Sequence, residues 1–372
     1  MKNIRVIYVV KESLHIYPPC ITQILLLNDY DIDVTIICGD CDSYLLNIFK
    51  KRNINCIIIG NKRIKIRFLG KVISYLRFRY KSWKVIKSLI SSNSFLWFGT
   101  ADSAIALMKK YKKTNYILSI LELYDTNSFY RNSLKYIIND ALAVIVCEEN
   151  RSRIMKSWYK MSYKPYVMPN KPYIHPNLIK HEPKTDEIEL AISKIKDKKI
   201  ILYQGIITAD RNLSTLAEAL KDLNSDYTLV MIGKQFYNGV DIVKKIYPNT
   251  IYLGFFPAPL HLHITNYAYI GVANYDDSSL NNIFCAPNKI YEYAGFGIPV
   301  LGSDVPGLIN TIGVFSAGEC VDFYDKKAII NAIKKIEKNY TVYSYNAKRF
   351  FDETNNNLIM QQIINKLIEK LK

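Results

Sequence analysis

A twice-repeated alternation of short apolar runs with longer amphipathic stretches constrains the fold of this chain more than any other feature. Several of the short runs are apolar at nearly every position, as parallel strands buried on both faces are. Helical patterns separate them, so the rhythm predicts a doubly wound α/β fold. The predicted strands are 4–10, 33–38, 56–59, 95–98, 116–120, 143–147, 199–204, 227–232, 250–253, 269–272 and 299–301. The predicted helices include 103–111, 129–142, 213–220, 259–265, 326–338 and 358–371.

The alternation stops and restarts, which predicts two domains. The first series ends at the segment Met168–Pro172, and a polar stretch rich in Lys, Glu and Asp follows over 176–198. A length of 372 residues also suits two domains. We expect Rossmann-like domains over 1–178 and 190–350 that face a central cleft, and a final helix within 351–372. Ligands of such sheets bind beyond the carboxyl ends of the strands.

The composition predicts a folded protein without a membrane-spanning segment. Apolar residues make up 49% of the chain and charged residues 22%, which is not the composition of a disordered chain. No apolar run reaches the ~20 residues that cross a bilayer. The first run, 4–10, is followed by Glu12 and lacks a signal-peptide cleavage site, so it is interpreted as a strand. The formal net charge of +17 favours anionic partners: nucleic acid, anionic lipid or phosphorylated substrates.

Seven cysteines are scattered along the chain, and only one pair has a motif spacing. Cys38-x-x-Cys41 follows a predicted strand, whereas a redox motif normally opens a helix. No second pair completes a zinc site. The pattern therefore favours reduced thiols in a cytosolic protein over a redox or metal motif.

The segment 285–300 carries the clearest chemistry. Asn288 is expected to cap a helix whose first turn presents Lys289 and Glu292 on one face. A helix amino end beside a lysine suits a phosphate, and a carboxylate one turn further on can accept hydrogen bonds from ribose hydroxyls. The alternative is an exposed Lys–Glu pair, which is common and contributes only ~0.3 kcal/mol.

A second segment, 199–212, also has the features of a phosphate-binding site. The strand 199–204 ends at Gly205, where a ligand can approach the backbone closely. Arg211, at the start of a helix expected from Asn212, offers a bidentate fork for a diphosphate. The alternative is an exposed charge at a helix cap.

The string Pro-Asn-Lys…Glu-Tyr-Ala-Gly-Phe-Gly-Ile-Pro-Val over 287–300 resembles the donor-binding segment of glycosyltransferase family 4. The loop from Gly205 to Arg211 resembles that family's Gly-Arg-x-x-x-x-Lys loop, with Arg211 at the Lys position. Weaker similarities at 250–257 and 303–307 extend the resemblance over about 199–319. The resemblance implies a GT-B fold, whose C-terminal helix can cross back to the first domain.

The same resemblance implies a function. We expect a retaining, hexosyltransferase-like enzyme that moves a sugar from a nucleoside diphosphate sugar to a glycan hydroxyl. Many members of the group with the Pro-Asn-Lys version act in bacterial surface-polysaccharide synthesis, on capsule, O-antigen or exopolysaccharide. Donor binding then falls on Gly205, Arg211, Asn288, Lys289 and Glu292, with no cofactor and no metal ion.

The sequence departs from the family pattern in three places. Phe284 stands where the family has the first of two glutamates, close to the transferred sugar. Ile206 stands where the family often has an arginine, and 11–19 contains no glycine. No catalytic residue is assigned. Glu122 and Asp125, after the strand 116–120, are candidates for contact with sugar or acceptor, with loop capping as an equal alternative.

The stretch 61–89 contains ten Lys or Arg residues, no acidic residue, and interleaved aromatics. Such a pattern is typical of binding to an anionic membrane surface, here at the inner face of the cell membrane, where a polyprenyl-linked acceptor would be presented. The alternative is a solvated helix face. Nucleic-acid binding is not expected, because no nucleic-acid-binding motif is present. The residues expected to bind the membrane are Arg77, Arg79, Lys81, Trp83 and Lys84.

Two other functions remain open at this stage. One is a GT-B-fold sugar-nucleotide epimerase, which would need acid and base groups but no acceptor. The other is a basic protein without enzymatic activity that binds membrane or nucleic acid.

Overall fold

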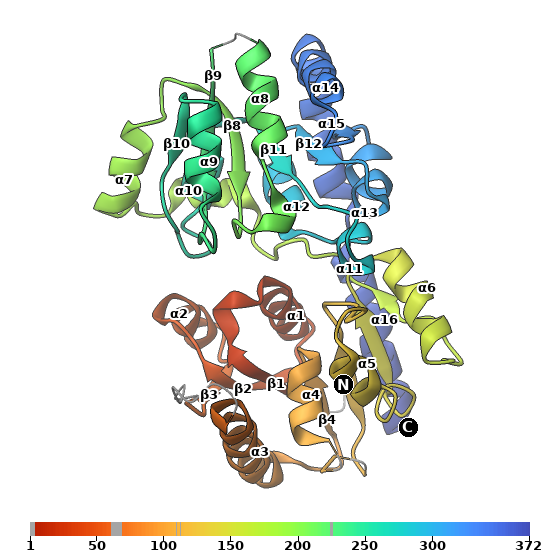
Figure 1. The fold of residues 1–372 in the computed structure, drawn as a ribbon. Helices are drawn as coiled ribbons and strands as arrows, with labels where there is room; N and C mark the ends of the chain where they lie inside the picture. The colour runs from red at the N-terminus through yellow and green to blue at the C-terminus, as the bar shows by residue number, and fades with distance from the viewer. Residues whose placement is uncertain (1–3, 61–68, 109, 112, 224–225) are drawn as a thin grey trace. The chain divides into compact units, whose positions relative to one another are not determined.

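The computed structural model describes residues 4–60, 69–108, 110–111, 113–223 and 226–372, and the chain forms two compact units (Figure 1). Unit 1 consists of Met1–Pro169 and Asn355–Lys372, and unit 2 consists of Asn170–Thr354. Each unit is a parallel sheet with helices on both faces, as the alternation of strands and helices predicts. The expected linker, 176–198, contains the 3₁₀ helix η2 (Pro176–His181) and the helix α7 (Asp186–Ser193), which belong to unit 2.

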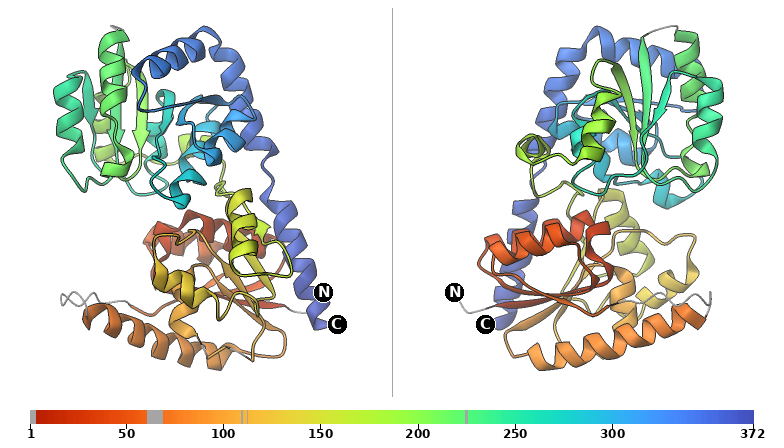
Figure 2. Two further views of the ribbon diagram at one scale, coloured as in Figure 1. Left: turned by 45° about the vertical axis from the view of Figure 1, so that its right-hand side comes forward. Right: turned by 90° about the vertical axis from the view of Figure 1, so that its left-hand side faces the viewer.

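Unit 1 contains a seven-stranded sheet in the order β3-β2-β1-β4-β5-β6-β7. Figure 2 shows α3 on the opposite face of this sheet from α1. The strands are β1 (Arg5–Ser13), β2 (Asp33–Asp40), β3 (Asn55–Ile58), β4 (Ser94–Phe98), β5 (Tyr116–Ser119), β6 (Ala143–Val146) and β7 (Tyr166–Val167). The helices are η1 (Leu14–Ile16), α1 (Pro18–Asp29), α2 (Ser43–Lys51), α3 (Leu69–Leu89), α4 (Ala101–Leu107), α5 (Ser128–Leu134), α6 (Glu149–Trp158) and α16 (Asn356–Leu371).

The C-terminal helix α16 belongs to unit 1, although unit 2 precedes it in the chain. It packs beside α1, and the Tyr30 hydroxyl, just after α1, donates to the Asn357 carbonyl at 3.2 Å. Met360, Ile363 and Leu367 form its buried stripe. The expected return of the last helix to the first domain is confirmed.

Unit 2 contains a six-stranded sheet in the order β10-β9-β8-β11-β12-β13. Successive side chains of β8 point to opposite faces of the sheet and pack into two separate hydrophobic cores. Ile200 and Leu202 pack on one face, and Ile201 and Tyr203 pack on the other. The strands are β8 (Lys199–Gln204), β9 (Tyr227–Ile232), β10 (Thr250–Tyr252), β11 (Ala268–Ala273), β12 (Val300–Ser303) and β13 (Gly318–Val321). The remaining helices are η3 (Ala209–Arg211), α8 (Ser214–Leu223), α9 (Gly239–Ile246), α10 (Leu262–Thr265), α11 (Leu280–Ile283), α12 (Asn288–Gly295), α13 (Pro306–Leu308), η4 (Ile309–Gly313), α14 (Lys326–Lys338) and α15 (Tyr340–Glu353).

All eleven predicted strands are present, within a few residues at their ends. Three predicted helices are shorter than expected: 103–111 ends at Leu107, 129–142 ends at Leu134, and 259–265 begins only at Leu262. After Leu134 the chain continues in turns, in which Ile137 and Ile138 are still buried. The apolar periodicity there reflects burial of a turn rather than a longer helix.

Candidate functional site

The donor-site candidates of unit 2 meet where β8 ends and α12 begins. Gly205 directly follows β8 with φ +134°, a backbone conformation that L side chains rarely adopt. A Cβ added at Gly205 would lie 3.2 Å from Lys289 Nζ, and one at Gly233 would lie 1.7 Å from the Gly205 carbonyl oxygen. Glycine at both positions therefore allows two strand ends to pack closely beside the first turn of α12.

Lys289 is the second residue of α12, and its side chain is buried without an acceptor. The residue is 6% exposed, and its Nζ has no hydrogen-bond partner among the described residues. Nζ lies 4.2 Å from the centre of the Tyr203 ring and 5.7 Å from that of Tyr275. Burial, together with the positive charge of Arg211, lowers the pKa of Lys289 well below its usual value, and Glu292 partly opposes this. A buried, unpaired ammonium group is a strong indication of an anionic ligand.

Arg211 contacts the same two tyrosine rings. Its guanidinium carbon lies 4.8 Å from the centre of the Tyr275 ring, and the guanidinium is hydrogen-bonded to Tyr203. Its Nε is buried without a hydrogen-bond partner and lies 3.8 Å from Asp210 Oδ2. Two cations thus converge on one aromatic surface beside the amino end of α12, whose first N–H groups have no intrahelical acceptors. This arrangement suits a diphosphate.

Glu292 lies one turn further along α12 and is held in a hydrogen-bond network. Gln204 Nε2 donates to Glu292 Oε2, and His261 Nε2 lies 3.2 Å from the same oxygen. The Thr265 hydroxyl donates to Gln204 Oε1 at 2.7 Å, which fixes the orientation of the amide. Because Glu292 is only 9% exposed, the predicted alternative of an exposed Lys–Glu pair is excluded.

Sequence reasoning missed most of this network. His261, Gln204, Thr265, Tyr203 and Tyr275 belong to no sequence motif. Their contacts depend on β8, α10 and α12 being neighbours in the fold, which no local sequence pattern reveals.

Two local predictions at the site are wrong. Asn288 does not cap α12; Pro287, with an extended backbone, is the N-cap, and Asn288 is the first helical residue. The helix expected from Asn212 begins at Ser214, because the Asn212 side chain accepts the Ser214 N–H at 2.9 Å and so ends the short helix η3 that contains Arg211. Phe284 follows α11, and its backbone N–H donates to the Leu280 carbonyl at 2.9 Å.

No protein-family model and no curated protein sequence matches this chain. Solved structures do match it over nearly its whole length. A glycosyltransferase from Rickettsia africae has a TM-score of 0.69 at 14% identity, covering 100% of both chains. HepE from Anabaena, in complex with UDP-glucose, has a TM-score of 0.70 at 13% identity, covering 99% of this chain and 100% of that one. A sucrose-phosphate synthase from Thermosynechococcus elongatus has a TM-score of 0.69 at 15% identity, covering 99% of each.

The chain has the GT-B fold. At these identities the similarity shows the fold alone: two Rossmann-like sheets, and a C-terminal helix that belongs to the first unit. The roles of individual residues rest on the contacts described here.

In unit 1 of this GT-B chain, the two acceptor candidates follow β5. The Glu122 side chain is 52% exposed, and its Oε2 lies 3.7 Å from an Arg151 guanidinium nitrogen. Asp125 lies in the loop before α5, where its carbonyl accepts from Arg131 at 3.5 Å. Both belong to unit 1, whereas the cluster around Lys289 belongs to unit 2.

The five membrane candidates lie on α3 but differ in accessibility. Arg79 donates to the carbonyls of Ala106 at 2.9 Å and Met108 at 3.0 Å, and Lys81 donates to that of Ile59 at 3.1 Å. Trp83 is half-buried, whereas Arg77 and Lys84 are exposed. The beginning of the basic stretch, 61–68, lies outside the described residues.

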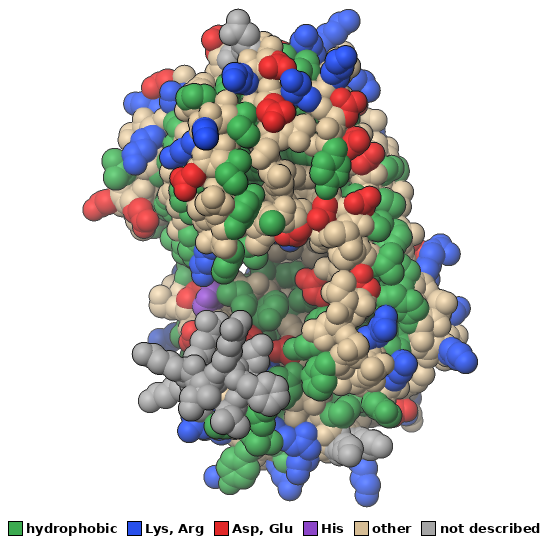
Figure 3. Space-filling model, viewed as in Figure 1, with side chains coloured by type: hydrophobic (Ala, Val, Ile, Leu, Met, Phe, Trp, Pro, Cys, Tyr) green, Lys and Arg blue, Asp and Glu red, His purple; other side chains and the backbone are tan. Residues whose placement is uncertain are grey.

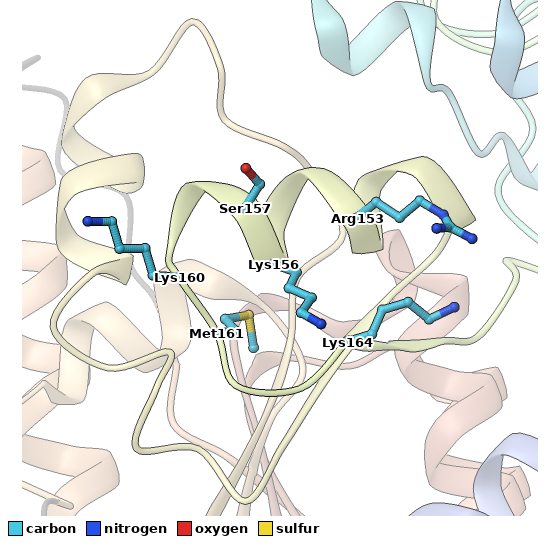
Figure 4. Close-up of a pocket in the computed structure, with 6 residues that line it drawn as sticks. All are labelled: Arg153, Lys156, Ser157, Lys160, Met161 and Lys164. Atoms are coloured by element: carbon cyan, nitrogen blue, oxygen red, sulfur yellow. The ribbon is translucent and has the colours of Figure 1, made fainter.

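A separate basic hollow of about 420 Å³ lies beside α6 in unit 1, lined by Arg153, Lys156, Ser157, Lys160, Met161 and Lys164 (Figure 4). Lys160 points away from Arg153 and Lys164. Arg153 and Lys164 both pair with Glu149, at 3.0 and 2.9 Å.

Proposed function

We propose that this protein is a glycosyltransferase that moves a sugar from a nucleoside diphosphate sugar to a hydroxyl group of a glycan acceptor. The observation that carries the proposal is the buried Lys289 amino group, which has no hydrogen-bond acceptor in the part of the chain that the structure describes and lies with Arg211 around the rings of Tyr203 and Tyr275. A diphosphate bound there would neutralise both cations and accept from the backbone N–H groups of α12.

Glu292 is proposed to bind the ribose. Both of its contacts, from Gln204 and His261, fall on Oε2, so Oε1 is placed to accept from a ribose hydroxyl. Gln204 is in turn held by the Thr265 hydroxyl.

Catalysis is proposed to come mainly from stabilising the departing diphosphate. Charge develops on the leaving oxygen as the glycosidic bond breaks, and donors already positioned for that charge lower the barrier. Arg211, Lys289 and the amino end of α12 are such donors. No nucleophile is assigned, and retention of the anomeric configuration is inferred from the resemblance of 287–300 to family 4 enzymes.

For the acceptor we propose the carboxyl ends of β1 and β4 in unit 1. Lys11 Nζ pairs with Glu12, lies 3.6 Å from Asp102 Oδ2 and lies 4.8 Å from the centre of the Tyr75 ring. Charged groups beside half-buried aromatic rings are the kind of lining that orients a polar ligand. A growing surface glycan on a polyprenyl carrier is the proposed substrate, with Glu122 and Asp125 as further contacts.

We further propose that the protein binds the inner face of the cell membrane through α3. Val72, Leu76 and Tyr80 are 45%, 58% and 74% exposed and recur every four residues, so they form one apolar stripe beside Arg77 and Lys84. Figure 3 shows hydrophobic and basic side chains together over this helix. Such a face suits an anionic leaflet, to which each basic residue contributes ~1 kcal/mol. No helix of the described parts of the chain is long and apolar enough to cross a bilayer.

Liposome sedimentation tests the membrane proposal. Leu76→Ser with Tyr80→Ser should release the protein from anionic vesicles, and Arg77→Gln with Lys84→Gln should weaken binding most at low salt. Lys327→Gln with Lys334→Gln, two exposed lysines of α14, is the matched control for lost charge. Equal sedimentation of all three variants and wild type would exclude α3 as the membrane-binding face.

Two experiments in series test the function. A thermal-shift screen with UDP, GDP, ADP and CMP should give one strong stabiliser, since a ligand at ~100 times its Kd adds ~2.7 kcal/mol of stability. The corresponding nucleotide sugars are then incubated with and without a lipid-linked glycan extract. Transfer that depends on the extract supports the proposal, whereas isomerisation of the nucleotide sugar without any acceptor identifies an epimerase. A protein that none of the four nucleotides stabilises is not a nucleotide-sugar enzyme of the proposed kind.

A further inference from the structure

Three thiols that are dispersed in the sequence meet at one edge of the unit 1 sheet. Cys38 lies in β2, Cys41 in the loop after it, and Cys56 in β3. Cys38 pairs in register with Ile58, and Cys56 is two residues before Ile58, so the two cysteines lie on the same face of the sheet. Their Sγ atoms are 3.7 Å apart, and the Cys41 thiol is hydrogen-bonded to both.

The three thiols differ in how easily a reagent reaches them. Cys38 is fully buried and Cys41 is 6% exposed, whereas Cys56 is half-buried. Cys56 is therefore the member of the cluster that meets solvent, with the other two beneath it.

They also differ in how readily they ionise. Hydrogen bonds from Cys38, and then from Cys41, lower the pKa of the Cys56 thiol. Hydrogen bonds with Cys41 and then with Cys56, followed by burial, raise the pKa of Cys38. The charge of His15 favours ionisation of Cys41, and His15 Nδ1 in turn lies 3.9 Å from Asp42 Oδ2. Cys56 is therefore both the thiol that ionises most readily and the one that solvent reaches. A cysteine with these two properties is reactive.

Two simpler explanations for the cluster do not fit. Among the described residues, no three His, Cys, Asp or Glu side chains are arranged to hold a metal ion, so the three sulfurs are not a metal site. Purely structural thiols are expected to be buried and protonated, as Cys20 is, whose pKa burial raises to about 12. Cys56 has neither property.

We propose that Cys56 is a reversible oxidation site that reduces a hydroperoxide and then forms a disulfide with Cys38. The Cys56 thiolate attacks the peroxide, forming a sulfur–oxygen bond as the oxygen–oxygen bond breaks, and the alcohol or water leaves with a proton. The sulfur of Cys38 then attacks the resulting sulfenic acid and loses its proton, and hydroxide leaves as water. One peroxide is reduced by two electrons, which the two thiols supply.

The second step requires the two sulfurs to approach and an edge strand to shift. A disulfide brings its sulfurs to about 2.05 Å and its Cα atoms to roughly 4.4–6.8 Å. The two Sγ atoms start 3.7 Å apart, but Cys38 lies opposite Ile58, two residues from Cys56, so standard strand spacings put the two Cα atoms roughly 8 Å apart. Closure therefore requires a shift of the edge strand β3 as well as rotation of the two side chains. Cys41 directly precedes Asp42, the N-cap residue of α2, so the backbone of Cys41 is held by the start of that helix. We therefore assign the disulfide to Cys38 rather than to Cys41.

Alkylation of the native, reduced protein gives the first test. With iodoacetamide at pH 6, Cys56 should react more than about tenfold faster than Cys320. Cys320 is the matched control, because it is also half-buried but burial, followed by the charge of Glu319, raises its pKa to about 12. Equal rates at the two positions would contradict a reactive Cys56.

Peptide mapping after a small excess of hydrogen peroxide gives the second test. Wild type should contain the Cys38–Cys56 disulfide and recover both thiols with dithiothreitol. Cys38→Ser should instead accumulate sulfenic acid at Cys56, detected with dimedone, and Cys56→Ser should leave Cys38 reduced. A disulfide at another pair, or stoichiometric zinc that protects the three thiols from peroxide, would overturn the proposal. Because the wild-type measurements need no variant, a variant that fails to fold does not prevent the test.

Discussion

Replacing Lys289 with methionine should have opposite effects on the free protein and on its complex with a nucleoside diphosphate. Methionine retains the length of the lysine stem and its contact with the Tyr203 ring but removes the charge. In the free protein the amino group is buried, has no hydrogen-bond acceptor among the described residues and is near a second cation, Arg211, so it costs free energy whether it stays charged or gives up its proton. Its removal should therefore stabilise unit 2 by about 1–3 kcal/mol. For a unit of this size, each kcal/mol of added stability should raise Tm by about 2–4 °C.

Binding should change in the other direction. A hydrogen bond to a charged group contributes ~1.5–3 kcal/mol, so the Lys289→Met variant should bind the nucleoside diphosphate roughly 10- to 150-fold more weakly. Isothermal titration calorimetry measures this loss, and differential scanning calorimetry measures the gain in Tm without ligand. Lys334→Met, at an exposed position of α14, is the control and should change neither quantity.

The lowered pKa of Lys289 also gives a dependence on pH. Between the folded pKa and the higher unfolded pKa, the unfolded chain binds more protons at this site, so the free energy of unfolding should rise with pH across that interval. Lys289→Met should lose this contribution. A diphosphate restores the charged form, so binding should take up protons in wild type and fewer in the variant, measured by calorimetry in buffers of different ionisation enthalpy. A variant that is less stable without ligand and binds normally would refute the reasoning on both counts.

Three further substitutions test the other parts of the site. Arg211→Ala should weaken nucleoside diphosphate binding by ~1.5–3 kcal/mol in calorimetry, and unchanged affinity would remove Arg211 from the diphosphate site. Glu292→Gln should weaken binding of the nucleoside diphosphate but not of inorganic pyrophosphate, which has no ribose; an equal effect on both would contradict the ribose role. Gly205→Ala should lower Tm by forcing a side chain into a positive-φ conformation, at about 1–2 kcal/mol, and should also weaken binding because the new Cβ contacts Lys289 Nζ. Normal stability and binding in Gly205→Ala would show that the close approach is not needed.

The sheets were predictable because parallel strands covered on both faces must be apolar almost throughout. β8 and β9 have this pattern and were found within a residue of their ends. β13 was not predicted, since it lies at the edge of its sheet, is mostly half-buried and includes the polar Glu319. β7 is also at an edge and contains only two residues.

The site was predictable only in part. Lys289 and Glu292 share a helix, so their spacing alone places them together. The contact of His261 with Glu292, and the absence of an acceptor for Lys289, arise from tertiary packing and have no local signal. Likewise, the spacing of Cys38 and Cys41 marks them as a possible motif in the sequence. The third thiol, Cys56, lies beside them only because β2 and β3 are neighbours in the sheet.

The central claim is that a diphosphate binds between Lys289, Arg211 and the amino end of α12. A crystal structure of the protein with the nucleoside diphosphate selected by thermal shift tests it most directly. We expect phosphate density within hydrogen-bonding distance of Lys289 Nζ and the Arg211 guanidinium, with the ribose hydroxyls hydrogen-bonded to the Glu292 carboxylate. Phosphate density elsewhere, with Lys289 Nζ still lacking an acceptor, would contradict it.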